Sequence, residues 1–396
     1  MADPLVSVIV RTHAGRSRLV AEALASIAAQ HYRPIEVIVV EDGSDDCSEV
    51  VAALPADDRL HVRHERIAKA GRCVAGNAGL ELATGELVNF LDDDDRLDPD
   101  HLLELVGLLN DQPSCVAAYA RARVVPTILR SLEPLVYDER PAWDFRARPF
   151  SRWHLWDENQ FPIQACLFKR SLYQQHGGID VDLPLLEDWE LWCRYLSDGR
   201  DVGFLDQVTS MFRLPAEGAA QHGRERDLAQ EISAAQRRIE DIPVTVASDE
   251  LRAAAVILMD DLFADSGWLT RARSMTTGRS PGRFLLLAPA RGVWRSARAM
   301  RGALRRPSMS VGSTRLLDAA MTGRGLVETL SVREAKASLS ALWRAEDLDR
   351  YLLLILRNRI GRTGLQTRWP VRVVRRRTGR GGAPPGAVAP VAPPRF

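Results

Sequence analysis

Strand-like and helix-like segments alternate four times in the first 110 residues, and this alternation limits the fold more than any other feature. Each strand-like segment is a short apolar run, and each is followed by a stretch with apolar residues at helical spacing. This pattern predicts an α/β fold, a doubly wound, Rossmann-like and mostly parallel sheet with helices on both faces. The expected strands are Leu5–Val10, Ile35–Asp42, Leu60–His64 and Leu87–Leu91, and the expected helices are Arg16–Gln30, Cys47–Leu54, Arg72–Ala83 and Leu97–Asn110.

The fourth helix has a marked start, with Asp98 as N-cap and Pro99 at the first helical position. After Ala122 the alternation ends. The later segments predict an insertion over the sheet edge at 126–160, a strand, short helix and Gly-Gly turn at 163–180, a helix with an acidic start at 185–199 and mostly helix at 223–266. The expected regions are an α/β domain at 1–220, a mostly helical, basic C-terminal region at 221–375 and a disordered Pro/Gly-rich tail at 376–396.

Acidic residues follow two of the expected strands. Asp42 ends the second strand, and the run Asp92–Asp95 ends the fourth. Ligands of such sheets bind at the carboxyl ends of the strands. A turn before a helix N-terminus also favours acids, but it explains one or two aspartates better than four. The simplest counter-charge is Mg²⁺ or Mn²⁺, which bind carboxylates and bridge to phosphates, and this indicates a nucleotide-linked substrate.

Charge is divided unevenly along the chain, although the whole has a net charge of only +1. Residues 271–396 carry 26 Lys or Arg and six Asp or Glu, a net of +20, which leaves −19 for residues 1–270. Within Arg283–Arg306, seven arginines are interspersed with apolar residues, which suits a helix lying on an anionic membrane. Two other interpretations stay open: pairing with the acidic part of the protein, and binding of nucleic acid without sequence specificity.

The five cysteines lie far apart and form no Cys-x-x-Cys pair. This indicates a reducing compartment and argues against a cysteine zinc site. The first ten residues lack the basic and long apolar regions of a signal peptide, and the late apolar runs are far shorter than the ~20 residues of a membrane-spanning helix. We therefore expect a cytoplasmic protein, with peripheral attachment to the inner face of the cell membrane left open.

Four blocks of sequence, in order, resemble the family 2 glycosyltransferases of the GT-A fold. They are VSVIVRTHAGR, IEVIVVEDGSDD, GNAGLELATGELVNFLDDDD and GGIDVDLPLLEDWELWCR, and the resemblance covers roughly Leu5–Arg213. Each block alone is a modest signal, but their order and spacing are specific. The resemblance implies a metal-dependent, inverting transfer of a sugar from a nucleotide-sugar donor, typically UDP-linked, to an acceptor hydroxyl.

Matching motif positions imply roles for single residues. Thr12 matches a nucleotide-contacting position, and Asp42 matches the acid that hydrogen-bonds the base. Asp92 and Asp94 match the DxD motif, with Asp94 as the direct ligand of Mn²⁺ or Mg²⁺. Asp188, in LEDWELW, matches the general base.

The sequence departs from the family pattern in the first and third blocks. Asn77 matches a donor-site position, but Gly76 stands where the family usually has the arginine of Arg-Asn-x-Gly. The basic contact to the donor is expected from Arg72 instead. Arg11 stands where many members have proline, and Arg213 matches weakly a basic position that closes over the diphosphate.

The residue chemistry also favours Asp188 as the base. A helix N-terminus favours the ionised carboxylate, and a base within reach of the acceptor hydroxyl contributes about 10²–10⁴ in rate. The alternative is that Glu187 and Asp188 only cap that helix. A single base opposite the leaving group implies direct displacement with inversion. His222 is a further candidate metal ligand.

We therefore expect a catalytic domain at 1–220 that acts in bacterial polysaccharide or glycoconjugate biosynthesis on a carbohydrate or lipid-linked acceptor, without specific nucleic-acid binding. The absence of a QxxRW string after EDWELWCRYL argues against a processive enzyme. A sugar nucleotidyltransferase is one alternative, although its usual Gly-rich first loop is missing from RTHAGRSR. A catalytically silent scaffold that binds sugar nucleotides is the other.

Overall fold

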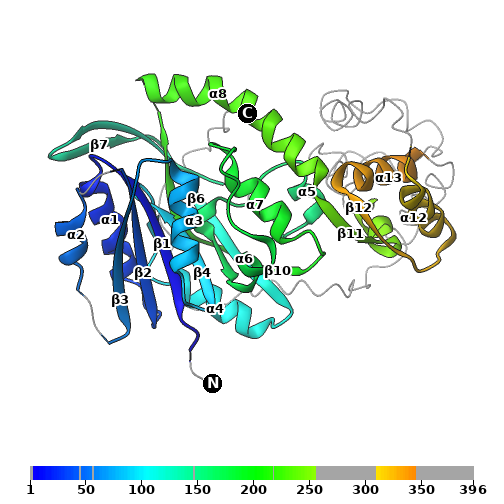
Figure 1. Cartoon of the computed structure of the whole chain (residues 1–396), viewed down its shortest axis with the longest axis horizontal. Coiled ribbons are helices and arrows are strands. Elements are labelled where there is room, and N and C mark those ends of the chain that lie inside the picture. The colour runs from blue at the N-terminus through cyan, green and yellow to red at the C-terminus, as the bar shows by residue number, and fades with distance from the viewer. Residues whose placement is uncertain are drawn as a thin grey trace, which may run out of the picture. The chain divides into compact units, whose positions relative to one another are not determined.

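The computed structural model describes residues 3–43, 46–55, 58–145, 148–216, 218–255 and 309–344 (Figure 1). The chain forms two compact units. The first includes the residues up to Leu196 and Arg200–Arg238, and the second includes Ser197–Gly199 and the described residues from Ile239 onward. The arginine-rich stretch at 283–306 and the tail lie outside the described residues, so the expectations for them stay predictions, as do the region boundaries.

The first unit is built on a mixed sheet in which β1 to β4 are parallel to one another (Figure 1). Its strand order is β3-β2-β1-β4-β9-β6-β10-β5. The predicted α/β class and its four strand–helix repeats are confirmed. The elements of these repeats are β1 (Val6–His13), α1 (Ser17–Ala28), β2 (Ile35–Asp42), α2 (Ser48–Ala52), β3 (Leu60–Ile67), α3 (Arg72–Leu82), β4 (Leu87–Asp92), the short β5 (Arg96–Leu97) and α4 (His101–Asp111).

Side chains along β1 alternate between the two faces of the sheet, and this decides what each of them contacts. Val8 and Val10 belong to the hydrophobic core that includes the apolar residues of α1 and α4. Ile9 faces the other side, where α3 packs over β1 and β2. The contact is close, because a Cβ added at Gly79 of α3 would lie 2.3 Å from Ile9 Cγ2. Arg11 follows Ile9 in this alternation and therefore shares the α3 face.

Helix α4 begins later than the sequence predicts. Its N-cap is Asp100, and the expected cap Asp98 lies before the helix. The backbone N–H of Asp98 donates to the carbonyl of Thr209 at 2.8 Å. This bond ties the segment to β10 (Asp201–Pro215), and the first helical turn forms only after it.

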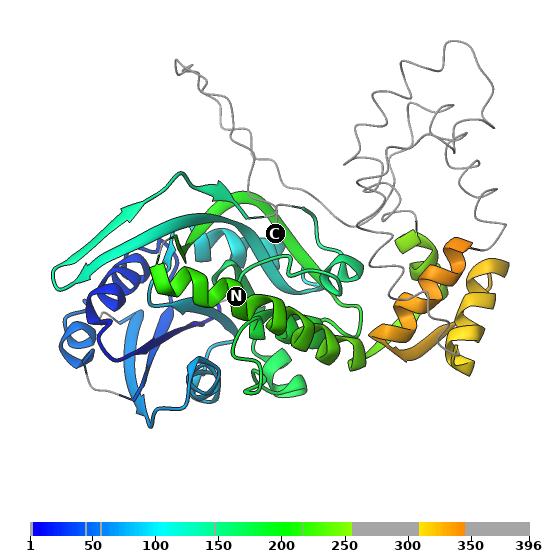
Figure 2. The same ribbon diagram turned by 90° about the horizontal axis from the view of Figure 1, so that it is seen from above.

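The insertion expected at 126–160 is a β-hairpin in its first part. β6 (Cys115–Leu132) continues without interruption through residues 126–132 and turns back into β7 (Leu135–Glu139). The two-residue strand β8 (Trp143–Asp144) also pairs with β6. Figure 2 shows the hairpin as a long arm at one end of the first unit. β-branched residues in the segment VVPTI favour this extended form over a loop.

The remaining elements of the first unit bring the acidic helix to the sheet. β9 lies between β4 and β6 and is antiparallel to both. The strand and short helix predicted in 163–180 and the helix predicted in 185–199 are confirmed. These elements are α5 (Arg152–Leu155), η1 (Ile163–Ala165), β9 (Cys166–Lys169), α6 (Ser171–His176) and α7 (Glu187–Tyr195).

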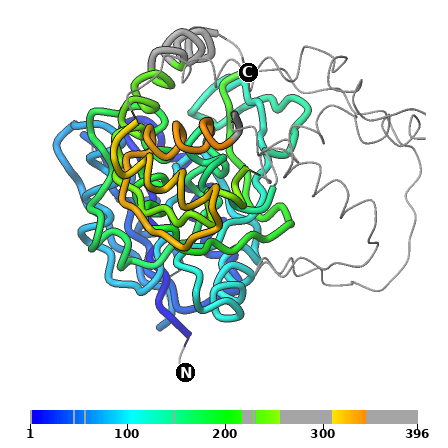
Figure 3. The backbone as a smooth tube through the Cα atoms, turned by 90° about the vertical axis from the view of Figure 1, so that its right-hand side faces the viewer, coloured from blue at the N-terminus to red at the C-terminus, as the bar shows by residue number. Residues whose placement is uncertain are grey.

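The described residues after α8 (Gly218–Asp241) include a two-stranded antiparallel sheet of β11 (Pro243–Ala247) and β12 (Val327–Ser331). Helices α12 (Val311–Thr322) and α13 (Val332–Arg344) lie side by side next to it (Figure 3). The region predicted as mostly helix at 223–266 also contains the strand β11, where Val244 and Val246 alternate with exposed or half-buried residues. In the part of the chain that the structure describes, no helix combines the length and apolarity needed to cross a membrane.

Gly79→Ala should destabilise the first unit by about 1–3 kcal/mol, because its methyl group would overlap Ile9 in a packed core. Gly107→Ala in α4 is the matched control, since an added Cβ there meets nothing within 4 Å. Urea denaturation of both variants measures the free energy of unfolding. Equal values for the two variants would contradict the packing described for α3.

Candidate functional site

The carboxyl ends of β2, β1 and β4 meet at one edge of the sheet, and most of the predicted site residues gather there. The strand register places His13 beside Asp42 and Arg11 beside Asp92. α3 also begins near this edge, because the backbone N–H groups of Ala70 and Gly71 bond Asp42. The acids at the ends of β2 and β4 are therefore close neighbours of the first strand, as the topology predicts.

Asp92 is held by a two-point ion pair with Arg11. Arg11 Nε donates to Asp92 Oδ1 at 2.7 Å, and Arg11 Nη2 donates to Oδ2 at 2.9 Å. Burial alone would raise the pKa of Asp92, but the positive charges of Arg11 and Arg72 outweigh it and hold this pKa below its usual range. Asp92 is therefore ionised, and both of its oxygens are engaged.

Asp93 lies on the opposite side of the strand end from Asp92 and has different partners. Thr12 Oγ1 donates to Asp93 Oδ2 at 2.6 Å, and Arg16 Nε donates to both carboxylate oxygens at 2.9 and 2.7 Å. Burial raises the pKa of Asp93 to about 6, although the charge of Arg16 opposes the rise. Thr12, which is expected to contact the nucleotide, thus donates its hydroxyl to an acid of the run in this structure.

Asp94 has the most accessible side chain among the three acids Asp92, Asp93 and Asp94. Its side chain is 36% exposed, against 23% for Asp92 and 6% for Asp93. Arg16 Nη2 donates to Asp94 Oδ2 at 2.7 Å, and no side chain or backbone group of the described residues donates to Oδ1. Asp94 Oδ1 is therefore without a donor from the described part of the chain.

Asp95 faces inward, where its Oδ1 accepts the backbone N–H of Arg213 at 3.1 Å. Burial, and next the negative charge of Asp94, raise the pKa of Asp95 well above its usual value. The guanidinium of Arg213 donates to the Asp94 carbonyl at 2.7 Å and to Glu22 at 2.8 Å, and it lies over the ring of Tyr137. Arg213 therefore lies beside the acidic run, but its charge is paired with Glu22.

Helix α7 joins this network through Glu187, which is 1% exposed. Glu187 Oε1 lies 3.1 Å from Arg11 Nη1 and 2.6 Å from Arg72 Nη2. Arg72 Nη2 also lies 3.4 Å from Asp92 Oδ2. Two arginines thus connect the end of β4 with the start of α7, although these segments are far apart in the sequence.

Asp188 follows directly after Glu187 but points to other partners. Asn159 Nδ2 donates to Asp188 Oδ2 at 2.8 Å, and the backbone N–H of Trp189 donates to Oδ1 at 2.9 Å. Burial, followed by the charge of Glu187, raises the pKa of Asp188 to about 6. The helix cap is Leu186, whose backbone is left-handed with φ 62° and which makes no side-chain cap bond. Asp188 therefore does not cap α7 from the N-cap position, although it accepts the Trp189 N–H of the first turn, which also bonds the Leu186 carbonyl at 3.1 Å.

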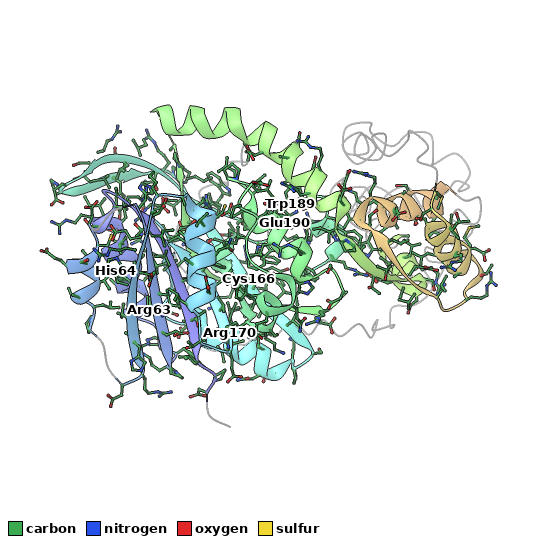
Figure 4. All side chains as sticks on the ribbon, in the orientation of Figure 1. Arg63, His64, Cys166, Arg170, Trp189 and Glu190 are labelled. Carbon is green, nitrogen blue, oxygen red and sulfur yellow. The ribbon has the colours of Figure 1, made fainter. Side chains whose placement is uncertain are left out.

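Aromatic packing fixes the surroundings of α7. Trp189 and Glu190 lie together on this helix (Figure 4), and the indole N–H of Trp189 donates to the Leu155 carbonyl. Trp153 of α5 and Trp156, the C-cap of that helix, pack edge to face, and all three tryptophans are buried. Their burial makes them part of the core that supports Asp188.

Asp42 and Asn77 make backbone bonds that hold loops at the site. Asp42 is buried, and its two carboxylate oxygens accept the N–H groups of Ala70 and Gly71 at 2.6 and 3.0 Å. Asn77 Nδ2 donates to the Ile179 carbonyl at 2.9 Å, and Asn77 Oδ1 accepts the Ile179 N–H at 2.6 Å. The donor contacts expected of Asp42 and Asn77 stay predictions, and in this structure both side chains position the backbone.

Asp94 fits a divalent cation better than Asp92 does. The described residues contain no group of three or more His, Cys, Asp or Glu side chains arranged around one metal position. Mg²⁺ commonly binds through one or two protein carboxylates together with substrate phosphates and water, so one accessible oxygen is sufficient for a shared site. Arg11 engages both oxygens of Asp92. The side chain of His222 lies outside the described residues.

Sequence reasoning missed that arginines supply the counter-charges visible at the acidic run. In the sequence Arg11 stands out only as a departure from the family pattern, and Arg16, Glu187 and Asn159 have no predicted part in binding or catalysis. Arg16 had a usable signal, since it lies in the turn directly after β1 at the ligand edge. Arg11 pairs with residues 81 and 176 positions away, and no local pattern shows such pairs.

An α/β domain with a DxD carboxylate at the end of β4 and a carboxylate at the start of α7 is the GT-A type of architecture that the sequence motifs imply. Residues 7–173 match the family model described as Glycosyl transferase family 2. This part of the chain belongs to glycosyl transferase family 2.

Several curated glycosyltransferases are similar to part of the chain. An uncharacterised glycosyltransferase of Rickettsia typhi is 29% identical over 49% of this chain and 59% of its own length. A glucosyl-dolichyl phosphate glucuronosyltransferase of Haloferax volcanii is 29% identical over 45% and 56%. A GalNAc(5)-diNAcBac-PP-undecaprenol beta-1,3-glucosyltransferase of Campylobacter jejuni is 43% identical over 24% and 31%. The chain thus spans less than two thirds of the length of each of these relatives.

Solved structures with a similar chain path are more distant in sequence. TarS of S. aureus aligns with a TM-score of 0.46 at 16% identity, covering 87% of this chain and 91% of that chain. The mannosyltransferase PcManGT from Pyrobaculum calidifontis, in complex with GDP-Man and Mn²⁺, aligns with a TM-score of 0.44 at 20% identity, covering 88% of both chains.

Asn159→Ala should raise the pKa of Asp188 above its value of about 6, because the hydrogen bond that the side-chain amide of Asn159 donates favours the ionised carboxylate. Carbon-13 NMR of the labelled carboxyl groups, assigned with Asp188→Asn, would follow this titration. Gln112→Ala is a suitable control, since this residue lies at the end of α4 and bonds Cys115 instead. An unchanged Asp188 titration in Asn159→Ala would show that the amide does not hold this carboxylate.

Proposed function

We propose that this protein is an inverting glycosyltransferase that moves a sugar from a nucleotide-sugar donor, a UDP sugar, to an acceptor hydroxyl. The observation that carries the proposal is the link between two carboxylate motifs. Asp92 of the DxD motif and Glu187 of α7 share the partners Arg11 and Arg72. The link brings the proposed base Asp188 to the same edge as the proposed metal ligand. The family match supports the same reaction.

The donor is proposed to bind along the carboxyl ends of β1, β2 and β4. Asp42 and Thr12 lie at this edge, where the family resemblance assigns them to the base and the nucleotide. Arg72 has a side chain 40% exposed at the start of α3, so its guanidinium is accessible to a diphosphate. The diphosphate would compete with Glu187 and Asp92 for the Arg72 guanidinium. Donor binding would therefore change the ion pairs between β4 and α7.

Asp94, with Asp92 behind it, would hold Mn²⁺ or Mg²⁺. When bound, such a cation supplies positive charge that stabilises the departing diphosphate. The protein contributes one exposed carboxylate oxygen for it and keeps the neighbouring acids paired with arginines. This pairing limits the repulsion that four adjacent carboxylates would otherwise exert on the anionic donor.

Asp188 is the proposed base. It accepts the proton of the acceptor hydroxyl as that oxygen forms a bond to the anomeric carbon and the bond from this carbon to the diphosphate oxygen breaks. A pKa of about 6 leaves Asp188 mostly ionised at pH 7 while keeping it more basic than an ordinary aspartate. Direct displacement with this one base inverts the anomeric configuration.

Two other functions fit parts of the site less well. A sugar nucleotidyltransferase would share the sheet and the metal but has no need for a base on α7. A scaffold that binds sugar nucleotides without turnover has no need for a half-buried carboxylate with a raised pKa. A release assay across UDP-, GDP- and dTDP-sugars separates the three, since only a transferase releases the nucleoside diphosphate when an acceptor is present.

Asp94→Ala should abolish Mn²⁺-dependent UDP binding and turnover while the fold stays intact, because it removes the exposed carboxylate at the end of β4. Isothermal titration with UDP, with and without Mn²⁺, measures the loss, and circular dichroism checks the fold. Asp138→Ala serves as a control for an exposed acid, as Asp138 pairs with Arg130 on the hairpin. Normal Mn²⁺-dependent turnover in Asp94→Ala would overturn the metal assignment.

Asp188→Asn should keep donor affinity but lower kcat by about 10²–10⁴-fold, because the amide retains the shape and cannot accept the proton. In the unaltered protein, kcat/KM should fall as the pH drops below about 6, where Asp188 becomes protonated. Donor titration and a pH–rate profile measure both effects. If Asp188→Asn retains both kcat and the acid limb of the profile, the base lies elsewhere.

The acceptor is proposed to be lipid-linked and to belong to polysaccharide or glycoconjugate synthesis in bacteria. The Campylobacter jejuni relative is named for a saccharide linked through PP to undecaprenol, and this supports a lipid-linked acceptor. The net charge of +20 at residues 271–396 supports attachment to an anionic membrane surface, where each basic residue contributes about 1 kcal/mol.

The full-length protein should therefore co-sediment with anionic vesicles at low salt and be released at high salt, since salt screens these charges. Replacing Arg291, Arg295 and Arg298 by glutamine should weaken this binding. Replacing the exposed Arg18 and Arg130 of the first unit should not. Vesicles of neutral lipid are the reference. Full-length protein that stays in the supernatant with anionic vesicles at low salt would exclude membrane attachment.

A further inference from the structure

Arg11 is an unusual residue for the interior of a parallel strand. It lies on β1 directly after a run of apolar residues, and only 3% of it is exposed. Arginine is almost never fully buried unless it is paired, because removing its charge from water is costly. The alternation of β1 turns this side chain toward α3, so its partners come from the α3 face of the sheet.

Those partners belong to two elements. Nε and Nη2 of Arg11 bond both oxygens of Asp92, and the remaining nitrogen, Nη1, bonds Glu187 Oε1 at 3.1 Å. The ring of Phe90 lies 5.5 Å from the guanidinium carbon. Each nitrogen of the guanidinium therefore has an assigned acceptor, and the planar group can adopt few other orientations.

The glycine at position 76 of α3 leaves the room that Arg11 occupies. A Cβ at Gly76 would lie 3.3 Å from Arg11 Cδ and 2.6 Å from Ile179 Cδ1. Any larger side chain at this position would press on the stem of Arg11. The two departures from the family pattern at positions 11 and 76 are thus neighbours, and the glycine leaves space beside the stem of Arg11.

We propose that Arg11 is a positioning residue for sugar transfer, and that Gly76 is required for it. This inference rests on the proposed function. Arg11 fixes the distance between the end of β4 and the first turn of α7, and so it sets the place of Asp188 relative to the donor. Arg11 acts through Asp92 and Glu187 and is not proposed to touch the donor or the acceptor.

Arg72 does not replace Arg11 in this task. It reaches Glu187 at 2.6 Å but Asp92 only at 3.4 Å, and its side chain is 40% exposed. A donor diphosphate would also compete for it. Without Arg11, Glu187 would keep only the partly exposed Arg72 among the two arginines that now pair with it. The start of α7, where Leu186 has a left-handed backbone, would then lose its two-point connection to β4 through Arg11.

The test compares Arg11→Lys with Arg194→Met in the full-length protein. Arg194 also lies on α7 and pairs with Glu190 through two bonds of 2.9 Å, and its Nη2 donates to the Gly178 carbonyl at 2.6 Å. Arg194 therefore ties α7 to the turn after α6, and none of these partners lies on β1 or β4. Lysine keeps the charge at position 11 and loses the two-point geometry. We expect Arg11→Lys to lower kcat about 10²-fold, as a displacement of about 1 Å at a reacting group does, with little change in donor Kd. Arg194→Met should lower the Tm but not kcat.

A double-variant cycle tests the role of Gly76. Gly76→Ala should lower kcat in the natural background and have a much smaller effect in an Arg11→Met background, since the methyl group then has no arginine stem to displace. The methyl group of Gly76→Ala would also meet Ile179 Cδ1, and Ile179→Val removes that atom. Adding Ile179→Val to Gly76→Ala therefore separates the clash with Ile179 from the clash with Arg11. Additive effects of Gly76→Ala and Arg11→Met on kcat would overturn the pairing.

The outcomes distinguish this inference from the proposed function. If the unaltered protein turns over no donor with any acceptor, the proposed function fails and the inference with it. If the unaltered protein is active and Arg11→Lys keeps kcat within about twofold, well below the 10²-fold expected of a misplaced base, the positioning role is wrong. A loss of kcat that follows the loss of Tm equally in Arg11→Lys and Arg194→Met would also overturn it.

Discussion

Four adjacent carboxylates at the end of one buried strand have to be compensated, and this constraint shapes the whole ligand edge of the first unit. The structure gives them partners from different directions. Arg11 on β1 holds Asp92, Arg16 in the following turn holds Asp93 and Asp94, and the backbone of Arg213 on β10 holds Asp95. Because each partner comes from a different segment, the acidic run connects the end of β4 to β1, to the turn after β1 and to β10. The arginines also neutralise part of the negative charge that an anionic donor would meet.

How the run divides its charge follows from strand alternation. Asp92 continues the α3 face of β4 and meets Arg11, while Asp93 turns to the α1 side and meets Thr12 and Arg16. The chain then leaves the strand, and Asp94 is left with an exposed oxygen. A motif that reads as a uniform string of aspartates thus becomes two anchored acids, one accessible acid and one inward acid.

The sequence predicted the parts of this site that depend on local pattern. Apolar runs and helical spacing gave the four strand–helix repeats, and the position of acids after apolar runs gave the ligand edge. The hairpin of β6 and β7 and the late start of α4 were not predicted, because pairing with β10 and within the hairpin decides them. The arginine partners of the acids were not predicted for a related reason. Arg11 lies far from Asp92 and Glu187 in the sequence, and only the fold brings these residues together.

Glu187 and Asp188 are neighbours in one helical turn, but their carboxylates have different partners and different proposed roles. Glu187 points into the network, where Arg11 and Arg72 take up its charge, so it has little left to offer a substrate. Asp188 points away from both of these bonds, and amide and backbone N–H groups hold it, while burial and the nearby negative charge of Glu187 raise its pKa. An ion-paired carboxylate is a weak base, whereas one held by neutral donors keeps its basicity and its orientation. The difference between structural acid and proposed base therefore arises from the direction each side chain takes at the start of α7, which Arg11 helps to fix.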